Sequence, residues 1–181
     1  MVSVFRPHTR LLSVRHNSLR VGLFGAVQRL RPVLAIALLV IAAGSAAEPT
    51  TSRELANVPL LRELKGKVVL LDFWASWCEP CRQSFPWMND LQRRYGERNL
   101  VVVAVNVDQD RKLAEQFLAA TPAGFRVEYD PVGTLAEKLG VETMPMSFLI
   151  DANGTLRSRH AGFKDTQRKE REAAIVGLLE Q

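Results

Sequence analysis

The sequence predicts an α/β fold in which helices cover both faces of a mixed central sheet. Two continuous apolar runs rich in β-branched residues, Val68–Phe73 and Leu100–Val105, are typical of strands that are buried on both faces. Segments with helical patterns follow these runs, which indicates alternating strands and helices. Near the C-terminus, the turn 151–154 contains an Asn-Gly step, a strong signal for a β-hairpin, and a terminal helix follows it.

The remaining elements are expected between and after the two buried strands. A helix over Cys78–Tyr95 follows the first strand and contains Pro86, which predicts a kink. A hairpin pairs Ser147–Ile150 with Thr155–Ala161 across the Asn-Gly turn. The other expected elements are the helix Lys112–Ala119, the short strand Phe125–Tyr129, the helix Gly133–Leu139 and the closing helix Gln167–Leu179.

The first 47 residues have the composition of a targeting leader. An uncharged apolar run from Pro32 to Ala47 follows several arginines and ends in small residues, which favours a cleaved secretory signal. An uncleaved membrane anchor and, because the first 31 residues are Arg-rich and acid-poor, a mitochondrial-type leader are the alternatives. Residues 48–58 are polar and predict a tether, so the folded domain is expected over residues 59–181. A signal or an anchor places this domain in the periplasm or otherwise outside the cytoplasm, where disulfides persist.

The net charge of +5 comes from the leader rather than from the folded part. Six arginines precede the first acidic residue, Glu48, and the chain from Glu48 onward carries 18 basic and 19 acidic residues, a net charge of −1. No basic patch interleaved with aromatic residues follows. The sequence therefore argues against a nucleic-acid partner.

Cys78 and Cys81 are the only cysteines in the chain, and they lie three positions apart. A structural zinc site needs about four ligands, and the chain has no cysteines beyond these two. A covalently attached haem needs a histidine directly after the second cysteine, and Arg82 stands there instead. A purely structural disulfide would close a very short loop, for which the entropic stabilisation is smallest. Two inert buried thiols are the remaining alternative, and only the position of the pair argues against them.

The cysteine pair lies where a buried strand gives way to a helix. Cys78 stands at the expected helix start, where free backbone N–H groups and the helix dipole favour a thiolate, the form that attacks a disulfide. Cys81 lies one turn further along, placed to attack Cys78 once a mixed disulfide has formed. Pro80 suits the first helical turn, where no hydrogen-bond donor is lost. This arrangement predicts a redox switch with Cys78 as the nucleophile and Cys81 as the resolving thiol.

The stretch DFWASWCEPC, with Pro86 after it, resembles the active site of thioredoxin-fold proteins. The longer frame LKGKVVLLDFWASWCEPCRQSFP, followed by VVVAVNVDQD and VETMPMSFLIDANG, is similar to the TlpA/ResA branch of extracytoplasmic thiol-disulfide oxidoreductases. The similarity covers roughly Leu64–Phe163, and Lys112–Val132 resembles the helix-and-strand insertion of that branch. The resemblance implies a thioredoxin-like fold over residues 59–181.

Asp72 lies inside the first apolar strand, six residues before Cys78. One interpretation is an aspartate at a strand end with a solvated side chain. The functional interpretation is a buried carboxylate whose pKa is raised by desolvation and which exchanges a proton with Cys81. Thioredoxins carry an aspartate at the matching place, whereas ResA-like proteins more often have a different residue there.

Glu79 and Pro80, between the two cysteines, are the candidate redox-tuning residues. If the Glu79 carboxylate leans toward Cys78, its charge raises the thiol pKa and disfavours the thiolate. A less stable thiolate favours the disulfide form and makes the reduced protein a better electron donor. The alternative is a solvated Glu79 side chain with no effect on the cysteines.

Three further residues are expected to form the substrate groove: Trp77, Met144 and Pro145. The resemblance implies a cis bond before Pro145, facing the two cysteines. It also implies that the backbone of Met144 pairs with an extended substrate, a form of strand addition. Trp77 is expected to shield the disulfide, with simple surface packing as the alternative.

The leading hypothesis is an exported thiol-disulfide oxidoreductase that reduces substrates through a mixed disulfide on Cys78. The resemblance implies disulfide-containing envelope proteins such as apocytochrome c as substrates, hence cytochrome c maturation, and a membrane-embedded electron-donor protein. No cofactor beyond the redox-active disulfide Cys78–Cys81 is expected, and the protein is expected to be a monomer. The alternatives are a disulfide-forming oxidase and a Cu(I) carrier, which would need His160 as a further ligand.

Overall fold

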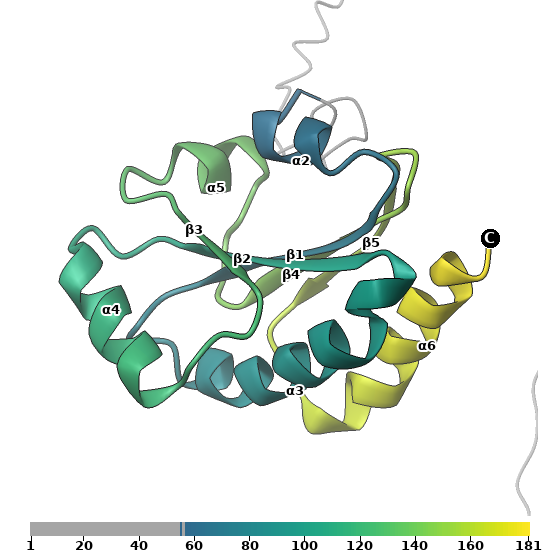
Figure 1. Ribbon diagram of the computed structural model, residues 1–181. Helices are drawn as coiled ribbons and strands as arrows, with labels where there is room; N and C mark the ends of the chain where they lie inside the picture. Colours follow the sequence, from purple (N-terminus) through teal and green to yellow (C-terminus); the bar gives the residue numbers. More distant parts are fainter. Residues whose placement is uncertain (1–54, 56) are drawn as a thin grey trace, which may run out of the picture. The chain divides into compact units, whose positions relative to one another are not determined.

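The computed structural model describes residue 55 and residues 57–181, which contain a five-stranded mixed sheet (Figure 1). The strand order is β3-β2-β1-β4-β5, with parallel pairs on the β2 side of β1 and antiparallel pairs on the β4 side. The mixed sheet and its C-terminal hairpin are therefore confirmed. The strands are β1 (Val68–Trp74), β2 (Leu100–Asn106), β3 (Arg126–Tyr129), β4 (Met146–Ile150) and β5 (Leu156–Ala161).

Helices lie on both sides of the sheet, as predicted. In Figure 1, α3, α4 and α6 lie below the sheet, and α2 and α5 lie above it. Two separate apolar clusters correspond to the two faces, one packed with residues of α3, α4 and α6 and the other with residues of α2 and α5. The helices are α2 (Pro59–Glu63), α3 (Glu79–Tyr95), α4 (Arg111–Ala120), α5 (Thr134–Lys138) and α6 (Arg168–Leu179), with 3₁₀ turns at Gly96–Arg98 and Asp165–Gln167.

Strand β1 is the centre of the sheet and carries the site. All seven of its residues are buried, as expected of a strand covered on both faces. Leu70 and Trp74 pack in the cluster that also contains both cysteines, while Leu71 and Phe73 pack in the other cluster. Because side chains alternate along a strand, Asp72 lies on the same face as Leu70, Trp74 and the cysteines.

The short helix α2 was not anticipated from the sequence. It has only five residues and begins with Pro59, whose missing N–H costs nothing in a first turn. Leu55 and Val58, at the end of the segment expected to be a tether, are buried in the core. The leader, with the expected signal or anchor, and residues 48–54 and 56 of that segment lie outside the described residues. Within the described part, no helix is long and apolar enough to cross a membrane.

The hairpin between β4 and β5 turns at the predicted Asn-Gly step. Gly154 adopts a positive φ of 85°, and its N–H donates to the carbonyl of Asp151 over 2.9 Å. The side chain of Asp151 accepts from the N–H groups of Asn153 and Thr155, which closes the turn. The strand register across this hairpin brings His160 opposite Ser147, a pairing that matters for the site.

Candidate functional site

The two cysteines form a disulfide at the N-terminus of α3. Cys78 is the N-cap residue, and its Sγ accepts a hydrogen bond from the N–H of Cys81 over 3.2 Å. The Cα atoms of the pair are 5.3 Å apart, and both residues are buried. In the reduced state, a thiolate on Cys78 would take the same capping position and would be stabilised by the helix dipole. The predicted placement of the pair is therefore confirmed.

A buried aspartate that the sequence reasoning missed holds the turn before Cys78. Asp108 follows β2, and its two carboxylate oxygens accept from the N–H and the hydroxyl of Ser76 over 2.8 and 2.9 Å. Its Oδ2 also accepts from the side-chain amide of Asn106 over 2.7 Å. A polar pair at the end of an apolar strand is the only sequence signal for this network. Asp108 fixes the backbone two residues before the nucleophile.

Asp72 is buried on the face of β1 that α3 covers, with 4% of its surface exposed. Its Oδ2 has no hydrogen-bond partner among the described residues. Burial raises the pKa of Asp72 to about 8, and the nearby positive charge of Arg171 offsets part of that rise. The predicted burial and the direction of the shift are confirmed, and a solvated strand-end carboxylate is excluded. Proton exchange with Cys81 stays a prediction.

Arg171 is a second residue that the sequence reasoning missed. It lies on α6 and is buried, and burial lowers its pKa. Its Nη2 donates to the carbonyl of Gly162 over 3.1 Å and to the side chain of Gln167 over 2.9 Å. Its spacing of four residues from buried Ile175 placed it on the inner face of the helix, and that was the available signal.

Glu79 and Pro80 occupy the first turn of α3, as expected. The side chain of Glu79 is 75% exposed, and a carboxylate oxygen lies 3.6 Å from Nε of Arg82. Its position matches the solvated alternative more closely than a carboxylate leaning toward Cys78. The effect of Glu79 and Pro80 on the redox properties of the cysteines stays a prediction.

The bond between Met144 and Pro145 is cis, as predicted. Met144 packs against the apolar cluster that contains both cysteines. The carbonyl of Pro145 accepts from the N–H of Gly162 over 2.8 Å, which ties this loop to the end of β5. Trp77, directly before Cys78, is 72% exposed. Trp77 thus presents an exposed apolar side chain next to Cys78. The use of Trp77, Met144 and Pro145 by a substrate stays a prediction.

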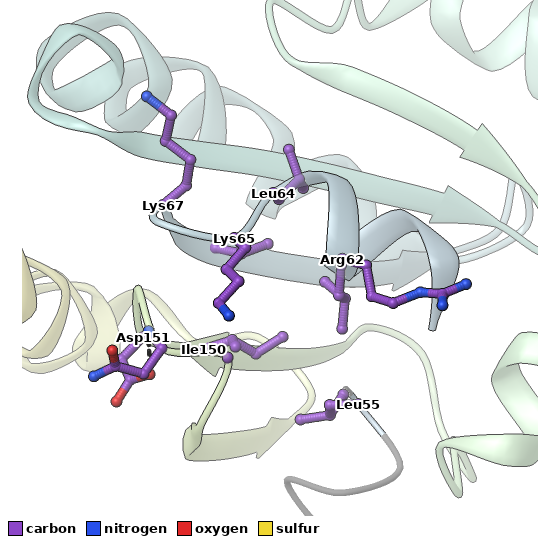
Figure 2. Close-up of a pocket in the computed structure, with 11 residues that line it drawn as sticks. Leu55, Arg62, Leu64, Lys65, Lys67, Ile150 and Asp151 are labelled. Atoms are coloured by element: carbon purple, nitrogen blue, oxygen red, sulfur yellow. Dashed lines mark hydrogen bonds between the residues drawn. The ribbon is translucent and has the colours of Figure 1, made fainter. Parts of the chain in front are cut away.

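Other chemistry-bearing features lie away from the cysteines. Among residue 55 and residues 57–181, no three histidine, cysteine, aspartate or glutamate side chains are grouped to hold a metal ion. A pocket of about 360 Å³ has a partly apolar lining and contains none of the predicted site residues (Figure 2). It lies at the beginning of β1, whereas Cys78 follows the end of that strand. It is lined in part by Leu55, Arg62, Lys65, Val69 and Ile150.

Comparisons with known proteins agree with this geometry. The Redoxin family model matches residues 42–175 of the chain. Thiol-disulfide oxidoreductase ResA of Bacillus thuringiensis subsp. konkukian is 34% identical over 110 residues, which cover 61% of this chain and 64% of ResA. Thioredoxin-like protein YneN of Bacillus subtilis is 35% identical over 115 residues, covering 62% of this chain and 66% of YneN. The chain thus spans a little under two thirds of the length of the ResA relatives.

Solved structures support the same fold. A Chlorobium tepidum protein assigned as a thiol:disulfide interchange protein DsbE is 49% identical, with a TM-score of 0.65 over 66% of this chain and 84% of that chain. The exposed lipoprotein thioredoxin Etrx1 of Streptococcus pneumoniae is 30% identical, with a TM-score of 0.57 over 65% of this chain and 90% of that one. The predicted thioredoxin-like fold is confirmed by these similarities.

Proposed function

The chain belongs to the redoxin family, and from this premise we propose that it is an exported thiol-disulfide oxidoreductase that reduces substrate disulfides. The observation that carries the proposal is the Cys78–Cys81 disulfide at the N-terminus of α3, with Cys78 as the N-cap residue. A thiolate at that position is stabilised by the helix dipole, and it lies directly after the exposed Trp77. The relatives named for thiol-disulfide chemistry support the same activity.

The reaction proceeds through two exchanges of sulfur partners. In the reduced protein, the Cys78 thiolate attacks one sulfur of a substrate disulfide, and the other substrate sulfur leaves as a thiolate. The Cys81 thiol then loses its proton, and its sulfur attacks Cys78 in the mixed disulfide. The second substrate sulfur leaves, and the protein disulfide re-forms. Two electrons pass from the protein to the substrate, whose two thiolates take up two protons.

Asp72 serves as the proton acceptor for Cys81 in the second exchange. It lies buried on the sheet face that packs against α3, the helix that carries Cys81. A carboxylate that is hard to ionise is a stronger base than a solvated one, so its raised pKa suits removal of a thiol proton. The carboxylate accepts a proton only in its ionised form. The activity should therefore rise as the pH increases through the pKa of Asp72, near 8.

The direction of electron flow is inferred to be reductive. The residues between the cysteines, Glu79 and Pro80, supply no positive charge that would stabilise the Cys78 thiolate. A dithiol without such stabilisation holds its disulfide form more strongly and gives up electrons more readily. The proposed substrates are disulfides of envelope proteins, with apocytochrome c in cytochrome c maturation as the candidate. A membrane-embedded electron-donor protein would reduce the Cys78–Cys81 disulfide again.

The proposed location is the periplasm or another extracytoplasmic compartment, with the protein as a monomer. The uncharged apolar run in the leader supports export, either as a cleaved signal or as a retained anchor. The name of the pneumococcal structural relative, an exposed lipoprotein thioredoxin, is consistent with this location. An oxidised cysteine pair is also stable outside the cytoplasm.

The first experiment measures the reduction potential of the Cys78–Cys81 pair in the full chain, equilibrated against glutathione or dithiothreitol. A value near or below that of thioredoxin, about −270 mV, would support a reductase. A value near that of DsbA, about −120 mV, would overturn the proposed direction and indicate a disulfide-forming oxidase. A Cys78→Ser and Cys81→Ser pair of variants would identify the nucleophile, because only the Cys81→Ser protein should accumulate the mixed disulfide.

The substrate groove is tested separately with Trp77→Ala. This variant removes an exposed indole and leaves the buried core unchanged. We expect weaker binding of a disulfide-containing protein and an unchanged reduction of a small disulfide such as oxidised glutathione. Equal losses for both substrates would indicate that Trp77 acts on the disulfide itself rather than on substrate binding.

A further inference from the structure

The strand register places a row of side chains across the sheet at the level of Asp72. Asp72 lies opposite Ser147 of β4, and Ser147 lies opposite His160 of β5. In the other direction, Asp72 lies opposite Ala104 of β2, and Ala104 lies opposite Val127 of β3. Directly paired residues point to the same face of a sheet. The row is therefore apolar on one side of Asp72 and polar on the other.

Aromatic rings pack together on the face of the sheet that carries Asp72. Trp74, Phe85 and Phe117 contact one another with ring centroids 4.7 to 5.0 Å apart. The side chains of Ala104 and Val127 can neither donate nor accept a proton, so the row offers no relay in this direction. The residues in this row that can carry a proton onward from Asp72 therefore lie on the β4–β5 side.

On the polar side, the structure contains a small hollow between the sheet and α6. Ser147, Ser158, His160 and Arg171 line it together with Trp87 and three apolar residues, Leu70, Leu149 and Ile175. The hollow has room for roughly one water molecule.

Several buried polar atoms around this hollow have no hydrogen-bond partner in the described residues. They are Trp87 Nε1, Ser158 Oγ and Arg171 Nε. Asp72 Oδ2 also has no partner; Asp72 does not line the hollow but lies opposite Ser147 in the row. Such groups are costly to leave unsatisfied, and several of them around one hollow favour a buried water there. Two strand spacings separate Asp72 from His160, roughly 10 Å, so a hydroxyl and a water between them are needed to connect the two.

The charges that face the row come from α6. Arg171 lies near both Asp72 and His160, and Glu170 interacts with His160 and Arg171. His160 is half-buried, and burial, together with the charge of Arg171, lowers its pKa. The imidazole is therefore neutral near pH 7, the form that can accept a proton on one nitrogen and release one from the other.

We propose that Ser147, the water site beside it and His160 form the path by which protons pass between Asp72 and solvent, with Arg171 as a positioning residue. The proposal rests on the proposed function, in which Asp72 accepts the proton of Cys81. When the dithiol is oxidised, the Cys81 proton moves to the Asp72 carboxylate. It passes through the water and the Ser147 hydroxyl to neutral His160, and the imidazolium releases it to solvent. Re-reduction of the disulfide runs the same path in reverse.

Arg171 positions the path because it holds the ends of two elements. Its guanidinium donates to the carbonyl of Gly162, whose N–H donates in turn to the carbonyl of Pro145. The strand that carries His160 ends immediately before Gly162. Arg171 thus fixes β5 against α6 while its charge faces the inner end of the row.

The test is the rate of Cys78–Cys81 oxidation by a disulfide substrate in weakly buffered solution, for wild type and His160→Ala. We expect the rate limited by proton transfer to fall about tenfold, the lower end of what a general acid–base group contributes, because water replaces the relay in part. Added imidazole should restore it, since it can occupy the space left by the side chain. The matched control is Arg159→Ala, which alters the neighbouring residue on the opposite face of β5. An unchanged rate in His160→Ala, or a loss that imidazole does not restore, would overturn the proposal.

A second measurement needs no substrate and separates this proposal from the proposed function. Carbon-13 NMR of the full chain with labelled aspartate follows the Asp72 carboxyl through its titration and reports how fast its proton exchanges. We expect slower exchange in His160→Ala and in Ser147→Ala, with the titration midpoint close to that of wild type. Wild-type exchange rates in both variants would overturn the proton path. A chain that reduces no disulfide but shows the slowed exchange would instead retain the path and refute the proposed function.

Discussion

Asp72 lies in strand β1, and Asp108 follows the neighbouring strand β2. Both carboxylates are buried, but they differ in the number of hydrogen-bond donors around them. Their exposed fractions are 4% and 5%. Both oxygens of Asp108 accept hydrogen bonds, three in all, from Ser76 and Asn106. One oxygen of Asp72 accepts none from the described residues. Burial alone therefore does not decide the role of an acid, because the number of donors around it decides whether its charge is stabilised.

The largest expected effect is that of Asp72→Asn on the free energy of unfolding. Between pH 4 and 8, the folded wild type holds a proton on Asp72 that the unfolded chain has released, so its stability falls as the pH rises. Asparagine has no such proton. We expect the variant to be more stable than wild type by about 4 kcal/mol at pH 7, with the difference disappearing toward pH 4.

This prediction is checked by urea unfolding of the oxidised protein at several pH values. The same variant should reduce disulfides about a hundredfold more slowly, because it cannot accept the Cys81 proton. A stability difference that does not depend on pH would contradict the raised pKa of Asp72.

The next effect is that of Asp108→Ala, which should have the opposite sign. The substitution leaves three donors on Ser76 and Asn106 without their acceptor in a mostly buried position. We expect a loss of about 3 kcal/mol in the free energy of unfolding, measured with urea at pH 7. Asp130→Ala is a matched control, since among the described residues that buried carboxylate accepts a hydrogen bond from the N–H of Ala136 alone and should cost less. Equal losses in the two variants would show that the three-bond network adds nothing.

A smaller effect is expected for Arg171→Met, which changes the surroundings of Asp72 and leaves those of Asp108 intact. Loss of the positive charge should raise the pKa of Asp72 further, because Arg171 lowers it in wild type. The pH range over which stability falls should then extend upward. At pH 5, where Asp72 is neutral, the loss of the bond to Gly162 should cost about 1 kcal/mol. A downward move of the Asp72 titration in carbon-13 NMR would contradict this prediction.

The smallest effect is expected for Glu79→Gln, the exposed counterpart of the two buried acids. Removing the charge should shift the reduction potential toward more positive values by no more than about 15 mV, which corresponds to about 0.7 kcal/mol. Solvent screens a carboxylate that is 75% exposed and already paired with Arg82. Equilibration against glutathione measures the shift. A change of more than about 30 mV would restore Glu79 as a principal tuning residue.

The sequence predicted those parts of the fold and site that depend on local pattern. The buried strands, the Asn-Gly hairpin and the cysteine pair at a helix start all follow from short stretches whose side chains or turns allow few alternatives. The burial of Asp72 could be expected for the same reason, since apolar residues surround it along β1. The cis bond before Pro145 was implied by family resemblance rather than by local chemistry.

The missed features depend on pairing between distant segments. Asp108 meets Ser76 across 32 positions, and His160 meets Ser147 only through the strand register. Arg171 is charged, and a charged residue on a terminal helix is normally assigned to solvent. Helix α2 has five residues, too few for a helical period to be visible. Physical contact between such groups is decided by tertiary packing, which one sequence does not display.

The exposure of Trp77 gives this molecule an intrinsic optical label. Its chain contains three tryptophans, and Trp74 and Trp87 are buried while Trp77 stands open to solvent beside the nucleophile. A water-soluble fluorescence quencher should therefore reach one indole of the three. A partner that docks over the cysteines would shield that indole, so complex formation could be followed in unmodified protein, without a dye.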